Sequence, residues 1–359
     1  MKRYIVDIFV LIALVIIFLF ATEKASYTVL VISRLLITGV TFVFLARSFK
    51  VLFYDNNISK KIKSYVTLFV ALLICFIILE NTFMFIPRSH GAGYTLGSKV
   101  WSSKYANDIN FLGYRDFKIK NDKQLILFAG DSFTWGHGIK KIKDRFSNIV
   151  GNKIDNYNTA NIGVRGFDSK DEYENLLSFV HKTKIKPDKI VLQYFGNDIE
   201  KIAIENGITF KGFTPYKKVN VLFKSLIKNS FLFNYLYWLY PQDESNTYLD
   251  FLETAYNDEY IFEKHSSDLS KFIDYAQNNS VELLVVVFPF LQDIPMSEDL
   301  YTEKIVKFFN TRNIKTIDMA KLLYGFKTKD LVVNSNDSHP SAMVNKIVAD
   351  EIIKILKEK

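Results

Sequence analysis

Cysteine and histidine are scarce in this sequence, which limits the kinds of site it can build. The 359 residues contain one cysteine, Cys75, which excludes an intrachain disulfide framework and a zinc site made of several thiolates. The five histidines are His90, His137, His181, His265 and His339. Their spacing matches no metal-binding motif, so we expect no histidine-rich metal site.

Long runs of one charge sign are also missing. The formal net charge is +8, but Lys and Arg are interspersed with Asp and Glu, which argues against a nucleic-acid partner. Hydrophobic residues make up 49% and aromatic residues 15%, a composition that excludes an intrinsically disordered protein. The length is sufficient for two domains.

Long apolar stretches are confined to the part of the chain before residue 88. They cover residues 5–21, 27–46 and 65–86. Each is close to the roughly 20 residues that a helix needs to cross a bilayer core. A cleaved signal peptide is the alternative for the first stretch, but two more stretches follow it. We therefore predict a three-helix transmembrane anchor over residues 1–87 that contacts the lipid bilayer.

Loop charges predict the orientation of this anchor. Lys2 and Arg3 precede the first stretch, and residues 47–64 carry five basic residues and one acidic residue. The positive-inside rule places both segments in the cytoplasm, so a three-span anchor delivers residues 88–359 to the extracytoplasmic side. With two spans instead of three, the domain would lie in the cytoplasm.

Charged residues inside the predicted spans are costly and therefore informative. Arg34 lies in the outer half of the second span and Glu80 near the outer end of the third, at similar depth. We expect the two side chains to pair. The alternative is that each extends separately to the headgroup region.

After residue 95 the pattern changes to alternating strands and helices. Apolar, β-branched runs predict strands at 124–129, 189–195 and 281–289, with weaker strands within 154–162 and at 315–318. Amphipathic patterns predict helices at 169–182, 262–278, 298–311 and 340–357. This alternation favours an α/β domain with a parallel sheet covered on both faces, where ligands bind at the carboxyl ends of the strands.

Residues 200–260 interrupt this alternation with an aromatic-rich segment, including FLFNYLYWLY at 231–240. Three interpretations remain open at this point. The segment could be a lid or substrate-binding insertion, a helix in the membrane interface, or an ordinary packed subdomain.

Three separate motifs carry groups suited to acyl transfer. Ser132 follows Gly130 and Asp131 at the end of the 124–129 strand, where a tight turn can present a nucleophile. Asn197 follows the predicted strand at 189–195, and its side-chain amide can donate a hydrogen bond to an oxyanion. Gly163 and Gly166 lie in a loop after another strand, and backbone N–H groups there could contribute to the same site.

The third motif joins Asp337 to His339 just before the last predicted helix. A histidine beside a carboxylate supplies a general base and the group that orients it. The alternative is that Asp337 or Ser338 simply caps that helix. His137 is a rival base, but it is close to Ser132 in the sequence. His90, His181 and His265 are expected at the surface or in linkers.

Taken together, the Gly-Asp-Ser turn, the glycine loop, Gly-Asn-Asp and the late Asp-His pair resemble the SGNH/GDSL hydrolase superfamily. The resemblance covers about residues 95–359, and Gly113-Tyr114-Arg115-Asp116 is similar to its bacterial membrane-anchored members. It implies a flavodoxin-like three-layer α/β/α domain and ester chemistry without a metal or cofactor.

Carried over by position, the resemblance implies Ser132 as nucleophile, His339 as base and Asp337 as the acid. It implies an oxyanion hole made of Ser132, Gly166 and Asn197, with Gly166 matching better than Gly163. Two departures stand out. Asp337 is two residues before His339 instead of three, and Gly196 is adjacent to Asn197 where the family has one residue between them.

The sequence therefore predicts an extracytoplasmic, membrane-anchored serine esterase that removes acyl groups, acetyl foremost, from envelope or exported glycans. An O-acyltransferase that receives its acyl group from a membrane acyltransferase partner uses the same acyl-enzyme and is the first alternative. A non-catalytic glycan-binding or assembly protein is the second.

Overall fold

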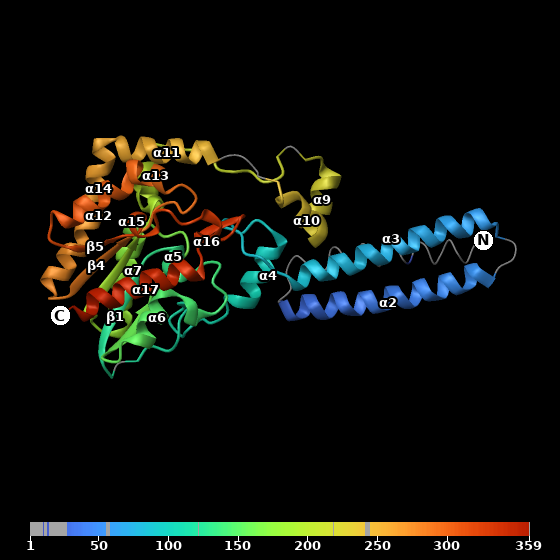
Figure 1. Ribbon diagram of the computed structural model, residues 1–359, viewed down its shortest axis with the longest axis horizontal. Coiled ribbons are helices and arrows are strands. Elements are labelled where there is room, and N and C mark those ends of the chain that lie inside the picture. The colour runs from blue at the N-terminus through green and yellow to red at the C-terminus, as the bar shows by residue number, and fades with distance from the viewer. Residues whose placement is uncertain are drawn as a thin grey trace. The chain divides into compact units, whose positions relative to one another are not determined.

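The computed structural model describes residues 27–54, 58–120, 122–217, 219–240 and 245–358, together with positions 10 and 13. The stretch 5–21, predicted as the first span, therefore lies almost wholly outside the described residues. The chain divides into two compact units (Figure 1). The first unit comprises Met1–Arg88, Gly93–Lys104 and Thr214–Gln242, and the second comprises Ser89–Ala92, Tyr105–Phe213 and Asp243–Lys359.

The second unit is built on a five-stranded sheet in which every neighbouring pair is parallel. Its strands are β1 (Gln124–Ala129), β2 (Tyr157–Asn161), β3 (Lys189–Tyr194), β4 (Glu282–Val287) and β5 (Lys315–Asp318). The spatial order β2-β1-β3-β4-β5 is one of the common orders of doubly wound α/β folds. The predicted parallel α/β sheet is thus confirmed.

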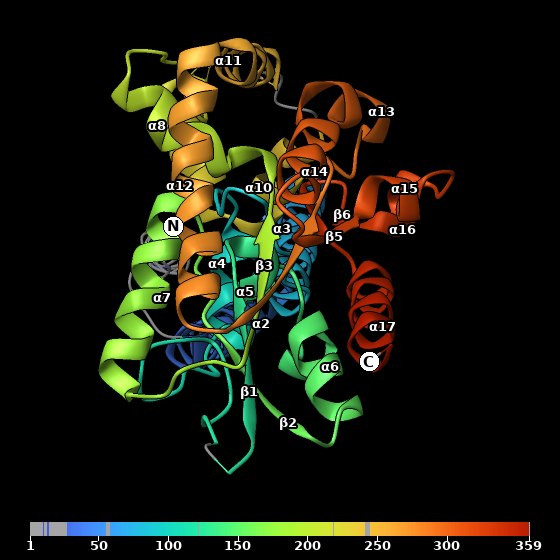
Figure 2. The same cartoon turned by 90° about the vertical axis from the view of Figure 1, so that its left-hand side faces the viewer.

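Each central strand buries both of its faces, which explains why these strands are continuous apolar runs. In β1, Leu125 and Leu127 join one core cluster, whereas Ile126 and Phe128 join another. Helices α7 (Ser169–Thr183) and α12 (Glu259–Asn278) cover the first face, and α6 (Phe146–Lys153) and α17 (Ala342–Lys357) cover the second (Figure 2). The sheet therefore lies between two helical layers.

The remaining elements of the second unit are shorter. They are α5 (Ser132–Trp135), α8 (Glu200–Glu205), α11 (Ser245–Asn257), α13 (Ile294–Ser297), a π-helical turn (Glu298–Thr302), α14 (Glu303–Asn310), α15 (Met319–Leu323), α16 (Thr328–Leu331), and 3-10 turns at Ile142–Asp144 and Gly196–Ile199. An antiparallel hairpin of β6 (Val332–Asn334) and β7 (Asp337–Pro340) precedes α17.

This hairpin changes the interpretation of the last motif. Asp337 and His339 lie on β7, and the N-cap of α17 is Ser341, whose Oγ accepts a hydrogen bond from the N–H of Val344. The alternative that Asp337 or Ser338 caps the last helix is therefore wrong. A strand, which no pattern predicted there, holds the Asp-His pair.

The first unit contains two long apolar helices, α2 (Tyr27–Tyr54) and α3 (Lys60–Phe85), which lie side by side. Both are long and apolar enough to cross a membrane. Within the most apolar 18 residues of each helix, only 22% of the stretch in α2 and 6% of that in α3 are buried. The same unit includes α4 (Leu96–Tyr105), α9 (Val221–Asn229) and α10 (Phe231–Trp238). The aromatic segment 200–260 is thus divided, because α8 and α11 belong to the second unit.

Arg34 and Glu80 form an ion pair between α2 and α3, with 3.1 Å between Nη1 and Oε1. Both side chains are fully buried. Glu80 Oε2 also accepts hydrogen bonds from Ser230 Oγ at 2.8 Å and the N–H of Leu232 at 3.0 Å. The carboxylate therefore caps the N-terminus of α10, where free N–H groups favour a negative charge. The predicted pairing is confirmed, and its link to α10 is an addition.

Candidate active site

The turn after β1 presents Ser132 at the first position of α5. Gly130 has a φ of +152°, and a Cβ there would lie 2.3 Å from Thr134 Oγ1. Asp131 is the N-cap, and its Oδ1 accepts a hydrogen bond from the N–H of Phe133 at 2.8 Å. Because the first N–H groups of a helix have no intrahelical acceptor, the N–H of Ser132 remains available to a ligand.

Gln193, on β3, holds this turn in place and was not identified from the sequence. Its Oε1 accepts hydrogen bonds from the N–H of Asp131 at 3.2 Å, and from the N–H and Oγ1 of Thr134 at 3.2 and 2.9 Å. The side chain is completely buried. A polar residue inside the apolar run KIVLQY was the signal that could have found it, because buried polar groups need partners.

Ser132, His339 and Asp337 form a continuous hydrogen-bonded chain. Ser132 Oγ lies 2.8 Å from His339 Nε2, and His339 Nδ1 lies 2.6 Å from Asp337 Oδ1. A carboxylate can only accept, so the proton of the neutral imidazole belongs on Nδ1. That tautomer leaves Nε2 as the acceptor for the hydroxyl of Ser132. The geometry is that of a nucleophile, a base and an orienting acid.

Asp337 is held in its charged form despite its burial. Burial alone would raise the pKa of its carboxyl, but the hydrogen bond from His339 and the charges of His339 and His137 outweigh it and lower the pKa to about 2. A permanently charged carboxylate at this position stabilises the imidazolium that forms when His339 takes a proton.

His137 lies beside the triad, and its backbone N–H donates to the carbonyl of Ser132 at 2.9 Å. Its ring packs against that of His339 at 4.3 Å between centroids, and its Nε2 lies 3.7 Å from Asp337 Oδ2 and 3.1 Å from the carbonyl oxygen of His90. Burial, followed by repulsion from His339, lowers the pKa of His137 to about 4. His137 is therefore neutral at neutral pH and faces the acid rather than Ser132.

Gly163 and Gly166 lie in the loop after β2, and of their two N–H groups only that of Gly166 is free within the described residues. The N–H of Gly163 is already donated to Asn161 Oδ1 at 2.9 Å, and a Cβ at Gly163 would lie 2.5 Å from the nitrogen of Trp135. Gly166 has a φ of +78°, and its N–H makes no hydrogen bond within the described part of the chain. Gly163 thus serves close packing, whereas Gly166 keeps a donor.

Asn197 lies in the 3-10 turn that follows β3 and is half-buried. Its Nδ2 is 3.4 Å from the carbonyl of Phe167, a contact at the upper limit of hydrogen bonding. Asp198 Oδ2 accepts from the N–H of Phe195 at 3.0 Å and fixes this turn. The side chain of Asn197 is therefore placed at the end of β3.

The residues Arg115 and Asp116 of the Gly-Tyr-Arg-Asp segment are buried beneath the site. Arg115 donates to the carbonyls of Gly136 at 2.7 Å and Ile139 at 2.6 Å. Asp116 forms an ion pair with Arg145 at 3.0 Å and accepts from the N–H of Asn161 at 2.8 Å. These contacts hold the segment that follows α5 and the end of β2 in place, so their role is to support the site.

His265 was expected at the surface, and this expectation is wrong. The side chain is buried on α12, and its Nε2 lies 2.8 Å from the hydroxyl of Tyr194. Burial lowers its pKa to about 3, so it is neutral. The surrounding contact between α12 and the sheet is apolar, and the hydrogen bond with Tyr194 gives the buried imidazole the polar partner that it needs.

One group of side chains could hold a metal ion among the described residues. His137, Asp337 and His339 each offer a ligand atom, and these atoms lie within 4.8 Å of one another. Both nitrogens of His339 already face hydrogen-bond partners, Ser132 and Asp337. A cation would have to break the His339–Asp337 hydrogen bond, so the donors fit a triad better than a metal centre.

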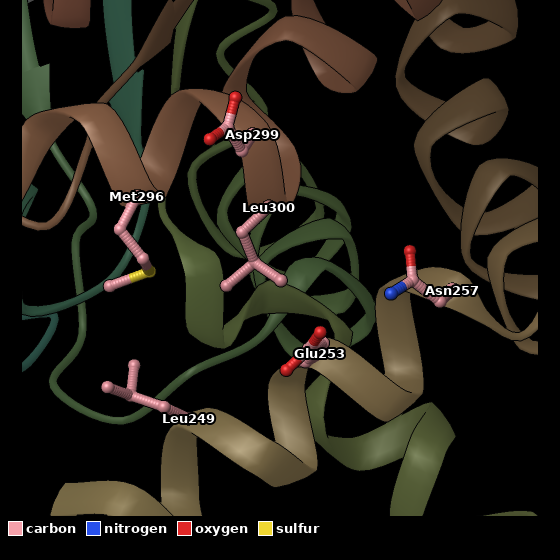
Figure 3. Close-up of a pocket in the computed structure, with 6 residues that line it drawn as sticks. All are labelled: Leu249, Glu253, Asn257, Met296, Asp299 and Leu300. Atoms are coloured by element: carbon pink, nitrogen blue, oxygen red, sulfur yellow. The ribbon is translucent and has the colours of Figure 1, made fainter.

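A pocket of about 460 Å³ lies elsewhere in the second unit, between α11 and the α13 region (Figure 3). Its lining residues are Leu249, Glu253, Asn257, Met296, Asp299 and Leu300. None of them belongs to the triad or to the two turns that surround it. The pocket is therefore not the site of the Ser132 chemistry.

Among solved structures, the chain is similar to a member of the lipolytic protein G-D-S-L family from Veillonella parvula, with 14% identity over 66% of this chain and 100% of that chain and a TM-score of 0.39. It is similar to a psychrotrophic esterase from a Pseudoalteromonas species, with 14% identity, 66% and 98% coverage and a TM-score of 0.39. It is also similar to a catalytic mutant of an acetylxylan esterase from Geobacillus stearothermophilus, with 12% identity, 68% and 98% coverage and a TM-score of 0.40. No family model and no curated protein matches the chain. The function is therefore inferred from the chain's own residues.

Proposed function

We propose that this protein is a membrane-anchored serine esterase of the SGNH/GDSL type, with Ser132 as nucleophile, His339 as base and Asp337 as the orienting acid. The observation that carries the proposal is the chain of two short hydrogen bonds, 2.8 Å from Ser132 Oγ to His339 Nε2 and 2.6 Å from His339 Nδ1 to Asp337 Oδ1. These three side chains come from β7 and from the turn after β1, so the fold assembles them from distant parts of the sequence.

In the proposed reaction, His339 takes the proton of Ser132 as Oγ attacks the carbonyl carbon of an ester. The N–H groups of Ser132 and Gly166 and the amide of Asn197 stabilise the oxyanion. The ester C–O bond then breaks, and His339 gives its proton to the departing alcohol. Water attacks the acyl-enzyme in the same way, which releases the acid and restores the serine.

The membrane part of the proposal is supported by the first unit. Helices α2 and α3 are apolar over a bilayer-spanning length, and their surfaces are mostly uncovered within the described residues. Basic residues between them favour a cytoplasmic loop, so the chain that follows α3 emerges on the opposite side whatever precedes α2. On this basis we assign the esterase unit to the extracytoplasmic side. The substrate class we assign to it is acyl groups, acetyl foremost, on envelope or exported glycans.

The test is acetyl-ester hydrolysis by the full-length protein in detergent or nanodiscs. The full chain is required because Gly93–Lys104 and Thr214–Gln242 belong to the same compact unit as the apolar helices. Wild type is compared with Ser132→Ala and His339→Ala on 4-nitrophenyl acetate. We expect both variants to lose at least about 10³-fold in kcat/KM.

A covalent readout makes the test independent of turnover. A fluorophosphonate probe should label wild type at Ser132, and mass spectrometry should locate the adduct. Ser132→Ala should not be labelled, while Ser103→Ala, a serine remote from the motif in the sequence, should be labelled normally. Equal hydrolysis by wild type and Ser132→Ala would contradict the proposal.

A further inference from the structure

An exposed arginine lies on the loop that flanks the nucleophile turn. Arg165 belongs to the segment between β2 and α7. The residue before it, Val164, donates its N–H to the carbonyl of Gly130 at 3.1 Å. Because Gly130 is two residues from Ser132, this hydrogen bond fixes the backbone next to Arg165 beside the proposed nucleophile.

The side chain of Arg165 lies over an aromatic ring of the same turn. Its guanidinium lies 4.3 Å from the ring centroid of Trp135, the last residue of the short helix that Ser132 begins. The Trp135 ring is 6.1 Å from that of His137, which in turn packs against the ring of His339. A guanidinium held over a ring by a cation–π contact retains N–H groups that can donate to a ligand.

No described carboxylate neutralises this cation through an ion pair. The acid of the site, Asp337, is occupied by His339 and His137. A second guanidinium, that of Arg115, also lies over Trp135 at 4.6 Å, but its N–H groups donate to buried carbonyls. Two cations thus share one indole, and the exposed one has no counter-ion of its own within the described chain.

We propose that Arg165 binds an anionic group, a carboxylate or a phosphate, on the alcohol part of the ester substrate. The guanidinium fork matches the geometry of both groups and holds either through two parallel hydrogen bonds. The substrate class is accordingly an acylated acidic glycan rather than a neutral one. This inference rests on the proposed esterase function.

The experiment compares acetyl esters that share one phenyl core and differ in the charge of its second substituent, using the full-length protein. The probes are 3-acetoxybenzoate, 3-acetoxyphenyl phosphate and the neutral 3-acetoxybenzamide, and the readout is the ratio of kcat/KM for each anionic ester to that for the neutral one. Arg165→Gln should lower this ratio about tenfold or more, mainly through KM. Arg165→Lys should retain part of it, and 0.5 M NaCl should reduce it in wild type.

Lys182→Gln is the matched control, since it removes one exposed positive charge at the end of α7, distant along the chain from the triad. It should leave all three rates unchanged. The carboxylate and phosphate arms show which anion is preferred. A ratio unaffected by Arg165→Gln, or an equal loss on charged and neutral esters, would overturn the inference and assign Arg165 to loop packing. Loss of neutral-ester hydrolysis in Ser132→Ala tests the esterase function separately.

Discussion

His137 and His339 pack against each other with 4.3 Å between their ring centroids, and Nε2 of His339 lies 2.8 Å from Ser132 Oγ. Two imidazoles this close cannot both carry a charge without cost, and burial already keeps His137 neutral at neutral pH. His137 therefore limits the rotation of His339 by packing against it, and His339 remains the group that takes the proton of Ser132. This arrangement gives His137 a positioning role that can be tested.

We expect His137→Ala to lower kcat about tenfold, because the space left beside His339 lets the ring rotate away from Ser132. KM for a small neutral ester should change little. His137→Phe should restore part of the rate, since a ring of similar size fills the same space. His181→Ala, on the exposed side of α7, is the control. Equal rates for the alanine and phenylalanine variants would show that packing is not what matters.

Asp337→Asn should lower kcat by about 10³–10⁴-fold, the range seen elsewhere for loss of the triad acid. The amide can donate to Nδ1, which favours the tautomer with a proton on Nε2 and removes the acceptor that Ser132 needs. A pH–rate profile checks this prediction. Wild-type activity that falls only below pH 3, in step with Asp337, would contradict the assignment of the base role to His339.

The same residue should contribute to stability in a pH-dependent way. Its pKa of about 2 lies below the ordinary value of 3.8, so the contribution is present above about pH 4 and is lost as the pH falls towards 2. At pH 7 it amounts to about 2 kcal/mol by linkage. Urea unfolding of wild type and Asp337→Asn at pH 7 and pH 3 measures the difference. The gap should narrow at the lower pH.

Much of this site could be predicted from the sequence because its parts follow strands that are easy to recognise. The apolar runs of β1 and β3 predicted where Ser132 and Asn197 lie, at the carboxyl ends of buried strands. The short β7 could not be predicted, since DSHP has no strand pattern and depends on pairing with β6. Gln193 was missed for a related reason, because its role exists only once the turn after β1 approaches it.

Sequence patterns also could not predict that the aromatic segment 200–260 is divided between the two units. Helix α10 belongs with the apolar helices because Glu80 accepts its N-terminal N–H groups, a contact across about 150 residues of sequence. Helix α11 follows it closely in the chain but packs with α12 in the second unit. Local periodicity predicts a helix but does not determine which neighbour it packs against.

Glu172 should affect the free energy of unfolding with a pH dependence opposite to that of Asp337. It is fully buried on α7, and neither carboxylate oxygen has a hydrogen-bond partner within the described residues. Burial, followed by the charges of Asp198 and Asp131, raises the pKa of Glu172 well above its ordinary value. The folded state must therefore hold a proton that the unfolded chain releases, and stability falls as the pH rises above about 4.5.

Glu172→Gln should accordingly stabilise the protein at pH 8, by about 1 kcal/mol or more, and have a smaller effect at pH 4.5. Thermal unfolding at the two pH values measures this. Glu174→Gln, two residues along the same helix, is the matched control and should change neither midpoint. A destabilised Glu172→Gln variant at pH 8 would show that the carboxylate is paired in the folded protein.

Asn197→Ala should lower kcat about 10²–10³-fold with a smaller effect on KM, as expected for a donor that acts mainly on the oxyanion. Gly166→Ala should reduce kcat through strain at a φ of +78°, although no atom lies within 4 Å of the added Cβ. Gly163→Ala should instead destabilise the fold, because its Cβ would meet the backbone of α5. Thermal midpoints measured beside kcat separate these outcomes. A normal kcat in Asn197→Ala would remove it from the oxyanion site.

The buried ion pair of the first unit predicts an asymmetric response to charge reversal. Arg34→Glu and Glu80→Arg should each impair assembly in the membrane, because each leaves a buried charge without its partner. The double variant should recover only part of the loss. An arginine at position 80 can pair with a glutamate at position 34, but it cannot accept the N–H groups of Phe231 and Leu232 at the start of α10.

Glu80→Gln separates the two roles of this carboxylate. The amide oxygen can still accept one hydrogen bond from α10, whereas the charge that pairs with Arg34 is gone. We expect Glu80→Gln to assemble better than Glu80→Arg, and Arg34→Met to restore part of the loss in Glu80→Gln by removing the unpaired cation. Protease resistance of the detergent-solubilised protein and its elution as a single species are the measurements. Full recovery in the double charge reversal would mean that the contact with α10 adds nothing, and that the ion pair alone holds these helices together.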